Sequence, residues 1–245
     1  MELVRYADRS DLHEIRFETL SARTFPAFMH HNQTGTRYWR RLVPEHPDFQ
    51  LGLVDDGALV AELHSLPLAW DGTLGDLPPG WDDVFERSFE SGRPHDCLAA
   101  LAISVLPERR SEGLAVRMID AMREAGRAHG LRDLIAPVRP TLKDRYPLIP
   151  IERYADWRRD DGSHFDPWVR IHERVGGEIL APAPDSMRIE APAVEWEEWT
   201  PMRFPEDGDY VVPGMLAPLR VRNGIGVHVE PNIWMLHRLA PSTES

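Results

Sequence analysis

Hydrophobic and polar positions along the first part of the chain predict short strands and one helix. Weak alternation over residues 2–6 predicts a first strand. Ser10 stands at an N-cap position, and the apolar residues that follow it at helical spacing predict a first helix. The runs 49–54 and 58–66 are apolar and flank the turn residues 55–57, Asp-Asp-Gly. This arrangement predicts a β-hairpin.

The middle of the chain carries the strongest pattern. Residues 98–106 form a near-continuous apolar run that ends at Pro107, which predicts a central strand covered on both faces. Residues 112–129 place Leu, Met and Ala on one helical face, and Gly130 stands at the C′ position. The next strand is expected at residues 134–138. Strand, helix and strand in this order indicate a βαβ-like unit in a mixed α/β domain.

Weaker signals complete the expected organisation. A short helix is predicted to end before Pro44, because the residue before a proline disfavours helix. We read residues 145–161 as an insertion or loop, and residues 240–245 as a frayed tail. We expect one domain over 1–245, with a core at about 1–180 and a C-terminal elaboration at about 181–245. The short helix before Pro44 is predicted at 37–42. Further predicted elements are helices at 81–89 and 166–175, strand-like runs at 186–191 and 226–236, and an ordered final strand at 230–234.

Composition narrows the classes of protein. The chain has 245 residues and a net charge of −12, which makes it a poor candidate for coating nucleic acid. No apolar run approaches the ~18 residues of a membrane span, and the first residues do not resemble a signal peptide. Cys97 is a single cysteine, so an internal disulfide is excluded. We therefore expect a cytoplasmic protein that binds neither nucleic acid nor membrane, with a homodimer left open.

One segment has the features of a phosphate site. The predicted central strand ends at about residue 106, and a tight turn leads from it into the long helix predicted from residue 112. The start of a helix offers free N–H groups and a positive dipole end, and both favour a phosphate or diphosphate. Gly113 permits close approach of the backbone, and Arg110 adds a cation. The same residues are also consistent with simple capping, since short glycine motifs are weak signals.

The pattern Arg110-x-x-Gly113-x-Ala115 resembles the acyl-CoA signature of the GNAT (N-acetyltransferase) superfamily, (Gln/Arg)-x-x-Gly-x-(Gly/Ala). The resemblance runs from about 98 to 138 and extends weakly to residues 5–15. It implies a central mixed, mostly antiparallel sheet flanked by helices, here with an extended C-terminal β-rich region. It also implies that the strand before the motif pairs with pantetheine and that one of its amides polarises the thioester carbonyl. The residues expected to bind the acyl-CoA are Ile103, Ser104, Val105, Arg109, Arg110, Ser111, Glu112, Gly113, Leu114 and Ala115.

The resemblance also suggests a general acid. His172 stands where the family often has a tyrosine that protonates the leaving thiolate, and the family's Gly-Phe is here Gly176-Gly177. A histidine suits such a transfer, because its pKa lies near neutral pH. Packing of His172 on its helix is the competing interpretation.

Candidates for the general base are less distinct. Glu62 and His64 lie two apart on a predicted strand and share a face. Residues 95–96, His-Asp, are second candidates. Residues 30–31, His-His, lie in a segment that borders the acceptor pocket in the family that this chain resembles. Adjacent histidines do not share a face, so we expect no metal. For each of these residues a structural role is the competing interpretation. Two regions are expected to shape acceptor choice, the insertion 70–89 and the tail 196–234. The aromatic residues of the tail line an acceptor pocket or form a second small core, and the second alternative is favoured.

The function implied is transfer of an acetyl or other acyl group from acetyl-CoA or another acyl-CoA to a small-molecule amine. Two alternatives remain at this stage. The acyl donor could be an acyl carrier protein thioester, held through its phosphopantetheine. The chain could also be a non-catalytic CoA-binding module, because fold does not dictate function. Dinucleotide binding is disfavoured, because no G-x-G-x-x-G follows the first strand.

Overall fold

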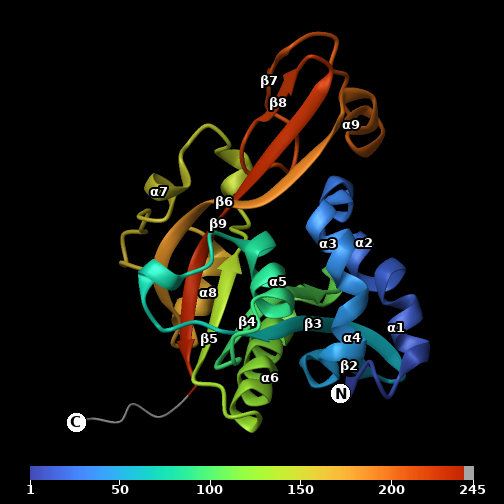
Figure 1. The fold of residues 1–245 in the computed structure, drawn as a ribbon, viewed down its shortest axis with the longest axis vertical. Helices are drawn as coiled ribbons and strands as arrows, with labels where there is room; N and C mark the ends of the chain where they lie inside the picture. Colours follow the sequence, from blue (N-terminus) through green and yellow to red (C-terminus); the bar gives the residue numbers. More distant parts are fainter. Residues whose placement is uncertain (240–245) are drawn as a thin grey trace.

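A computed structural model describes residues 1–239, and its centre is one twisted sheet (Figure 1). The strand order is β1-β2-β3-β4-β5-β9-β8-β7, and β6 also pairs with β9. All pairings are antiparallel except β4 with β5. The strands are β1 (Glu2–Arg5), β2 (Gln50–Asp55), β3 (Ala58–Leu68), β4 (Cys97–Val105), β5 (Asp133–Val138), β6 (Glu178–Pro192), β7 (Gly208–Tyr210), β8 (Leu219–Arg222) and β9 (Ile225–Arg238).

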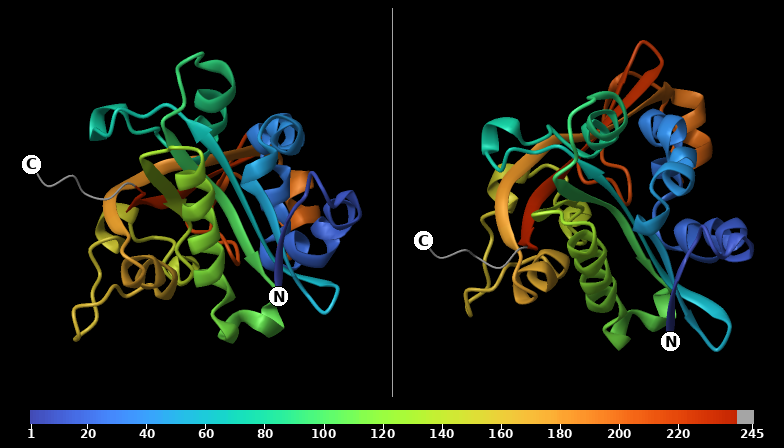
Figure 2. Two further views of the ribbon diagram at one scale, coloured as in Figure 1. Left: turned by 90° about the horizontal axis from the view of Figure 1, so that it is seen from below. Right: turned by 60° about the horizontal axis from the view of Figure 1, so that its bottom comes forward.

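Helices cover both faces of the sheet (Figure 2). Leu114 and Met118 of α6 pack on β2–β5, and α7 and α8 cover β5 and β9 on the same side. Tyr38 of α3 and Phe85 of α5 pack on the opposite face. The helical segments are α1 (Ser10–Arg16), the π-helical η1 (Phe17–Ser21), α2 (Ala22–Thr24), η2 (Ala27–His31), α3 (Gln33–Tyr38), η3 (Trp39–Arg41), α4 (Leu42–Glu45), η4 (Pro47–Phe49), η5 (Leu74–Asp76), α5 (Trp81–Glu90), η6 (Pro107–Glu112), α6 (Leu114–Ala128), η7 (Lys143–Arg145), α7 (Ile151–Tyr154), α8 (Pro167–Arg174) and α9 (Ala193–Trp199).

The parallel strands β4 and β5 separate after a short contact. They pair only from Cys97↔Asp133 to Ala99↔Ile135. Leu239 N donates to Arg132 O, so from Arg132 onward every second residue forms its main-chain hydrogen bonds with β9. Pro137 is one of the residues in between, and its main-chain nitrogen therefore points toward β4. Proline has no N–H to donate, so pairing with β4 cannot continue. Opposite this point the β3–β4 register shifts between His64 and Ser65, which makes Leu101 the extra residue of a bulge.

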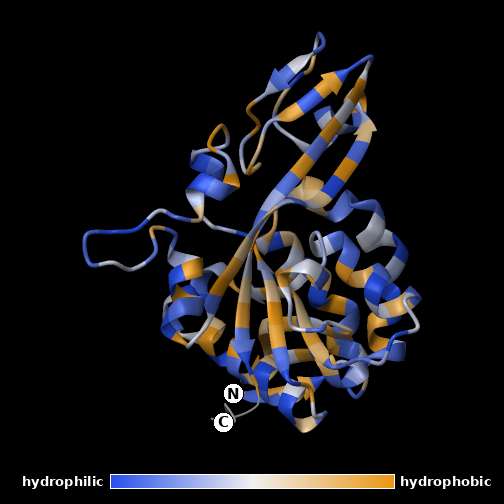
Figure 3. Cartoon of the chain, turned by 60° about the vertical axis from the view of Figure 1, so that its left-hand side comes forward, coloured by the Kyte–Doolittle hydropathy of each residue, from blue (hydrophilic) through white to orange (hydrophobic). Residues whose placement is uncertain are grey.

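Strands β6 and β9 continue beyond the main sheet and form an arm with β7, β8 and α9 (Figures 1 and 3). Figure 3 shows hydrophobic and hydrophilic residues alternating along the arm strands, as expected when one face is buried. Trp196 of α9 is fully buried, and its indole donates to Gly226 O at 3.0 Å. A Cβ on Gly226 would lie 2.5 Å from the Trp196 ring, so only glycine allows this packing.

The predicted fold class is confirmed, as are the hairpin, the strands β4 and β5 and the helix α8. The turn of the hairpin has positive φ at Asp56 and Gly57, and Asp166 caps α8 by accepting from two backbone N–H groups. Three predicted boundaries were wrong. Ser10 is the first helical residue and not the cap, Pro44 lies inside α4, and the long helix begins at Leu114 after the separate turn η6. The predicted frayed tail, 240–245, lies outside the described residues.

Candidate active site

The predicted acyl-donor loop lies between β4 and α6. Gly113 is the residue before α6 and has φ +75°, in the left-handed region that favours glycine. A Cβ built on Gly113 meets no atom within 4 Å, so the space beside the loop is open. Arg110, Ser111 and Glu112 are exposed beside it, whereas Leu114 is buried under the sheet and anchors the helix start. The turn therefore presents exposed backbone and one cation at the positive end of a long helix.

Arg109 is already engaged within the protein. Its guanidinium donates to Asp55 Oδ2 at 2.9 Å and also to the carboxylate of Glu112. These contacts tie the donor loop to the β2–β3 hairpin. Arg110 forms no ion pair with any residue of the part of the chain that the structure describes. The predicted contact with a diphosphate therefore depends on Arg110 rather than on Arg109.

The main chain of β4 faces the gap left by β5. Leu106 N donates to Val60 O, so every second residue back along β4, including Ser104, forms its main-chain hydrogen bonds with β3. Ile103 and Val105 lie between these residues, and their N–H and C=O groups point toward the gap. The Leu101 carbonyl is held differently, because the Trp81 indole donates to it at 2.9 Å in a buried contact. A side chain from α5 thus takes the place of the missing strand partner at the bulge.

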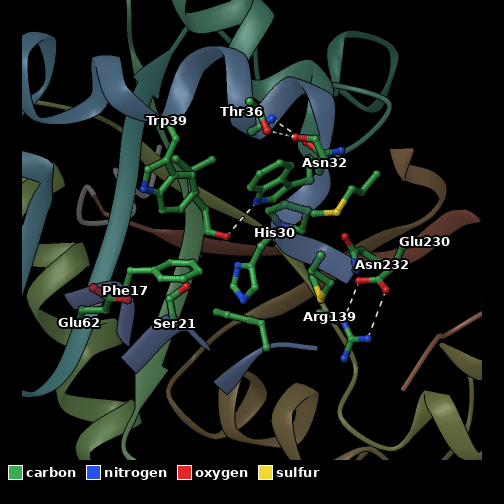
Figure 4. Close-up of a pocket in the computed structure, with 18 of the residues that line it drawn as sticks. Phe17, Ser21, His30, Asn32, Thr36, Trp39, Glu62, Arg139, Glu230 and Asn232 are labelled. Carbon is green, nitrogen blue, oxygen red and sulfur yellow. Dashed lines mark hydrogen bonds and ion pairs between the residues drawn. The ribbon is translucent and has the colours of Figure 1, made fainter. Parts of the chain in front are cut away.

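A cavity of about 260 Å³ opens where the two strands separate, on the sheet face covered by α3 and α5 (Figure 4). Its floor is formed by Leu101 and Ala102 of β4 and by Pro137 of β5. The π-helical turn η1 brings Phe17 and Ser21 to its wall, and such turns are frequent at functional sites. The other lining residues are Arg16, Phe25, Met29, His30, Asn32, Gly35, Thr36, Trp39, Glu62, Trp81, Arg139, Met187, Glu230 and Asn232.

Glu62 of β3 lies at one end of the cavity (Figure 4). Its Oε2 accepts from Tyr6 Oη at 2.9 Å and lies 3.2 Å from His64 Nε2 and 3.6 Å from Arg16 Nη1. Burial raises the pKa of Glu62, but His64 and Arg16 lower it by more, so the net pKa lies below its ordinary value. Glu62 and His64, predicted to share a face, are therefore in contact. Glu62 lines the cavity, and His64 lies behind it.

The opposite end carries a second buried carboxylate, Glu230 of β9. Arg139, which directly follows β5, donates to Glu230 through two nitrogens at 2.7 and 3.2 Å. Its Nη2 also donates to Gly214 O in the arm at 2.6 Å. Asn232 lies beside Glu230 and accepts from Ser186 Oγ of β6 at 2.5 Å. The cavity is thus polar at both ends, with the two aromatic rings of Trp39 and Trp81 between them.

His172, the predicted general acid, lies on α8, which covers the sheet face opposite the cavity. Its side chain is buried, and its Nδ1 lies 2.9 Å from Nε2 of the buried His237. Burial, reinforced by His237, lowers the pKa of His172 to about 3. His172 is not among the residues that line the cavity. Its role as an acid remains a prediction, and the geometry favours the competing packing role.

The other candidates for the general base lie in different places in the structure. His95 lies 3.1 Å from Ser88 O, and Asp96 accepts from Trp70 N and Arg132, so both stabilise the far end of β4. His31 stacks on Trp199 of α9 at 3.9 Å. His30, in contrast, points into the cavity (Figure 4), and its Nε2 has no hydrogen-bond partner among residues 1–239.

Sequence reasoning placed Trp81 only within a region expected to shape acceptor choice, and it did not single out Arg139, Glu230 or Asn232. Arg139 and Glu230 meet only because β9 pairs with β5, and 91 residues separate them in the chain. Pro137 was the one local signal, since a proline inside a predicted strand indicates interrupted pairing. The aromatic tail forms mainly a core, because Trp196, Phe204 and Trp234 pack together with α3 and α5 residues.

Two solved structures are similar to this chain over nearly its whole length. The GphF GNAT-like decarboxylase in complex with isobutyryl-CoA matches with a TM-score of 0.60 and 17% identity, over 98% of this chain and 100% of that one. The loading GNATL domain of CurA from Lyngbya majuscula matches with a TM-score of 0.59 and 17% identity, over 97% of each chain. These two matches show that the chain has the GNAT fold.

One curated relative is similar along most of its sequence. The arginine N-acetyltransferase avaD of Aspergillus versicolor is 29% identical over 267 aligned positions, which cover 94% of this chain and 91% of that protein. No family model matches the chain.

None of the helices within residues 1–239 is long and apolar enough to cross a membrane. The same residues contain no group of three or more His, Cys, Asp or Glu side chains that could hold a metal ion.

Proposed function

We propose that this protein is an acyl-CoA-dependent N-acyltransferase that transfers an acetyl group to the amine of an amino acid, with arginine or a related basic amino acid as acceptor. The fold and the relative support the reaction class. The relative's substrate supports arginine. The observation that carries the proposal is a cavity that opens where β4 and β5 separate and has one carboxylate–guanidinium pair at each end.

The donor would occupy the α6 side of this gap. Its diphosphate would lie on the start of α6 near Gly113 and Arg110, and its pantetheine would run along Ile103 and Val105. The thioester then reaches the floor of the cavity beside Ala102. A backbone N–H facing the gap can polarise the thioester carbonyl, and fixed dipoles of this kind contribute strongly to acyl transfer.

The acceptor would occupy the cavity itself. A zwitterionic amino acid needs partners of both signs, and the cavity supplies Glu62 with Arg16 at one end and Glu230 with Arg139 at the other. The rings of Trp39 and Trp81 provide an apolar surface for the side chain, and such rings also attract a guanidinium. We assign the α-amine and the α-carboxylate, which share one carbon, to the end where Glu62 and Arg16 offer opposite charges, and the side-chain guanidinium to Glu230 at the other end.

The chemistry follows from this placement. The neutral amine attacks the thioester carbon, a C–N bond forms, and the C–S bond breaks to release the CoA thiolate. The nitrogen gives up one proton, which Glu62 accepts, and the thiolate takes up a proton to become free thiol. Proton transfer by a positioned side chain contributes about 10²–10⁴-fold to such reactions.

Thiol release with acetyl-CoA tests the proposal. We expect turnover with arginine, weaker turnover with agmatine, which lacks the carboxylate, and none with Nα-acetylarginine, whose amine is blocked. Glu62→Gln should lower kcat/KM by about 10²-fold or more while CoA affinity stays unchanged. The matched variant His30→Gln should reduce it much less. If His30→Gln causes the larger loss, His30 is the base instead.

The donor alternatives are tested in the same assay. Turnover with an acyl carrier protein thioester but not with acetyl-CoA would replace the donor and keep the site. Tight CoA binding with no thiol release from any amine would instead support the non-catalytic module.

A further inference from the structure

Gln50 is a fully buried polar residue at the start of β2, directly opposite His64 of β3. Its Nε2 donates to His46 O at 3.1 Å and to Ser65 O at 2.7 Å. Its Oε1 lies 2.9 Å from His64 Nδ1. The two carbonyl partners decide which way the amide points, because the flipped amide would set its oxygen against both of them. The Gln50 oxygen therefore faces His64.

This orientation dictates where His64 carries its proton. An amide oxygen only accepts, so Nδ1 of His64 must be the donor. In a neutral imidazole Nε2 then has no hydrogen, and Nε2 faces Glu62 Oε2 at 3.2 Å. With Glu62 ionised, two acceptors would face each other in a buried contact. One further proton between Nε2 and Oε2 removes this conflict, whichever atom holds it.

The surrounding groups are few. The Tyr6 hydroxyl of β1 donates to Glu62, and the Tyr6 ring stacks on His64 with centroids 5.8 Å apart. From α1, Arg16 lies 3.6 Å from Glu62, and His13 packs on Tyr6. The uncharged Trp39 ring covers the remaining side of His64. Burial lowers the pKa of His64, Glu62 raises it and Arg16 lowers it, so the net pKa of His64 lies below its ordinary value. Glu62 and His64 thus titrate as one coupled pair.

We infer that Gln50 is a positioning residue: it fixes the first proton of His64 on Nδ1, so that Glu62 and His64 together store one further proton, the proton that the acceptor amine releases. This inference rests on the proposed function for the origin of that proton. When the store is empty, Glu62 and Nε2 repel each other. The empty pair therefore takes up a proton more readily than an isolated buried carboxylate beside Arg16 would.

The tautomer can be measured without any acceptor. Long-range ¹H–¹⁵N NMR of the full chain, with His64→Gln to assign the signal, should show His64 protonated on Nδ1 throughout neutral pH. In Gln50→Met, a variant of similar length with no acceptor oxygen, the proton should move to Nε2 and bond to Glu62. A wild-type spectrum with the proton on Nε2 alone would overturn the inference, even if the protein turns over arginine.

The pH profile of kcat/KM supplies a second readout. Gln50→Met should move the acid limb to lower pH by about one unit, because the empty pair is no longer destabilised. Gln50→Glu should move it to higher pH, because a carboxylate at Nδ1 favours the imidazolium. Calorimetric CoA affinity should stay unchanged in both variants. Identical midpoints in all three proteins, with only lower thermal stability, would reduce Gln50 to a packing residue. If the wild type turns over no amine, the proposed function fails and the NMR result still decides the role of Gln50.

Discussion

Substitution of Gly113 by aspartate tests the donor site most directly. The backbone there has φ +75° but open space around a Cβ, so the folded state should tolerate a side chain at a cost of about 1 kcal/mol. The new carboxylate would face the diphosphate. Two like charges 4 Å apart repel by about 1 kcal/mol in water and more at a protein surface. For a diphosphate beside an exposed turn we expect about 2 kcal/mol, which is roughly a 30-fold loss of CoA affinity.

Calorimetric titration with CoA measures this loss, and Gly113→Asn is the matched control. Asparagine has nearly the same shape, also tolerates positive φ and carries no charge. The difference between the two variants therefore isolates the electrostatic effect. It should shrink at about 1 M salt, where the screening length falls to roughly 3 Å. Equal CoA affinity of Gly113→Asp, Gly113→Asn and wild type would refute the assignment of the diphosphate to this turn.

Three further predictions concern residues away from this turn. Trp81→Phe keeps a ring in the cavity but removes the donor to the Leu101 carbonyl, so kcat should fall about tenfold while CoA affinity stays nearly unchanged. Steady-state kinetics measures kcat and calorimetry measures CoA affinity, and a parallel loss of both would contradict this prediction. His172→Ala should lower the free energy of unfolding by about 1–3 kcal/mol, measured by urea denaturation, and leave kcat within twofold; a loss of 10²-fold in kcat would restore His172 as the general acid. The pKa of His172 is lowered to about 3 and that of His237 to about 4, so below pH 6.5 the unfolded chain binds more protons than the folded chain does. Thermal stability should therefore be full above that pH and decline as the pH falls toward 4. A melting temperature that stays constant from pH 7 to 4.5 would contradict this.

Local sequence signals predicted the segment from β4 to α6 well. The apolar run of β4, the glycine before α6 and the amphipathic face of α6 are all short-range patterns, and each depends on neighbours within one or two turns. The pair Glu62 and His64 was also accessible, because alternation along a strand places both on one face. Their hydrogen-bond partner Gln50 could not be predicted, because only the exact register of β2 against β3 shows that Gln50 lies opposite His64.

Three residues that line the cavity could not be predicted from local patterns, and the reason is physical. Arg139, Glu230 and Trp81 come from three segments that meet only through the full sheet order and the docking of α5. His172 shows the converse error. Helical periodicity places it on a face of α8, but it does not say which side of the sheet that helix covers.

Strand β9 joins the two halves of the molecule, and this has a consequence for how new substrates can be acquired. Its C-terminal half pairs with β5 in the main sheet, whereas Glu230 and Asn232 lie where it leaves for the arm. The donor turn contributes nothing to the cavity walls. Under the proposed function, changes in the arm would therefore alter which amine is accepted while leaving the thioester chemistry intact. A library of variants confined to β6, β9 and the loop before β8 is the economical starting point for redesigning this protein toward other amines.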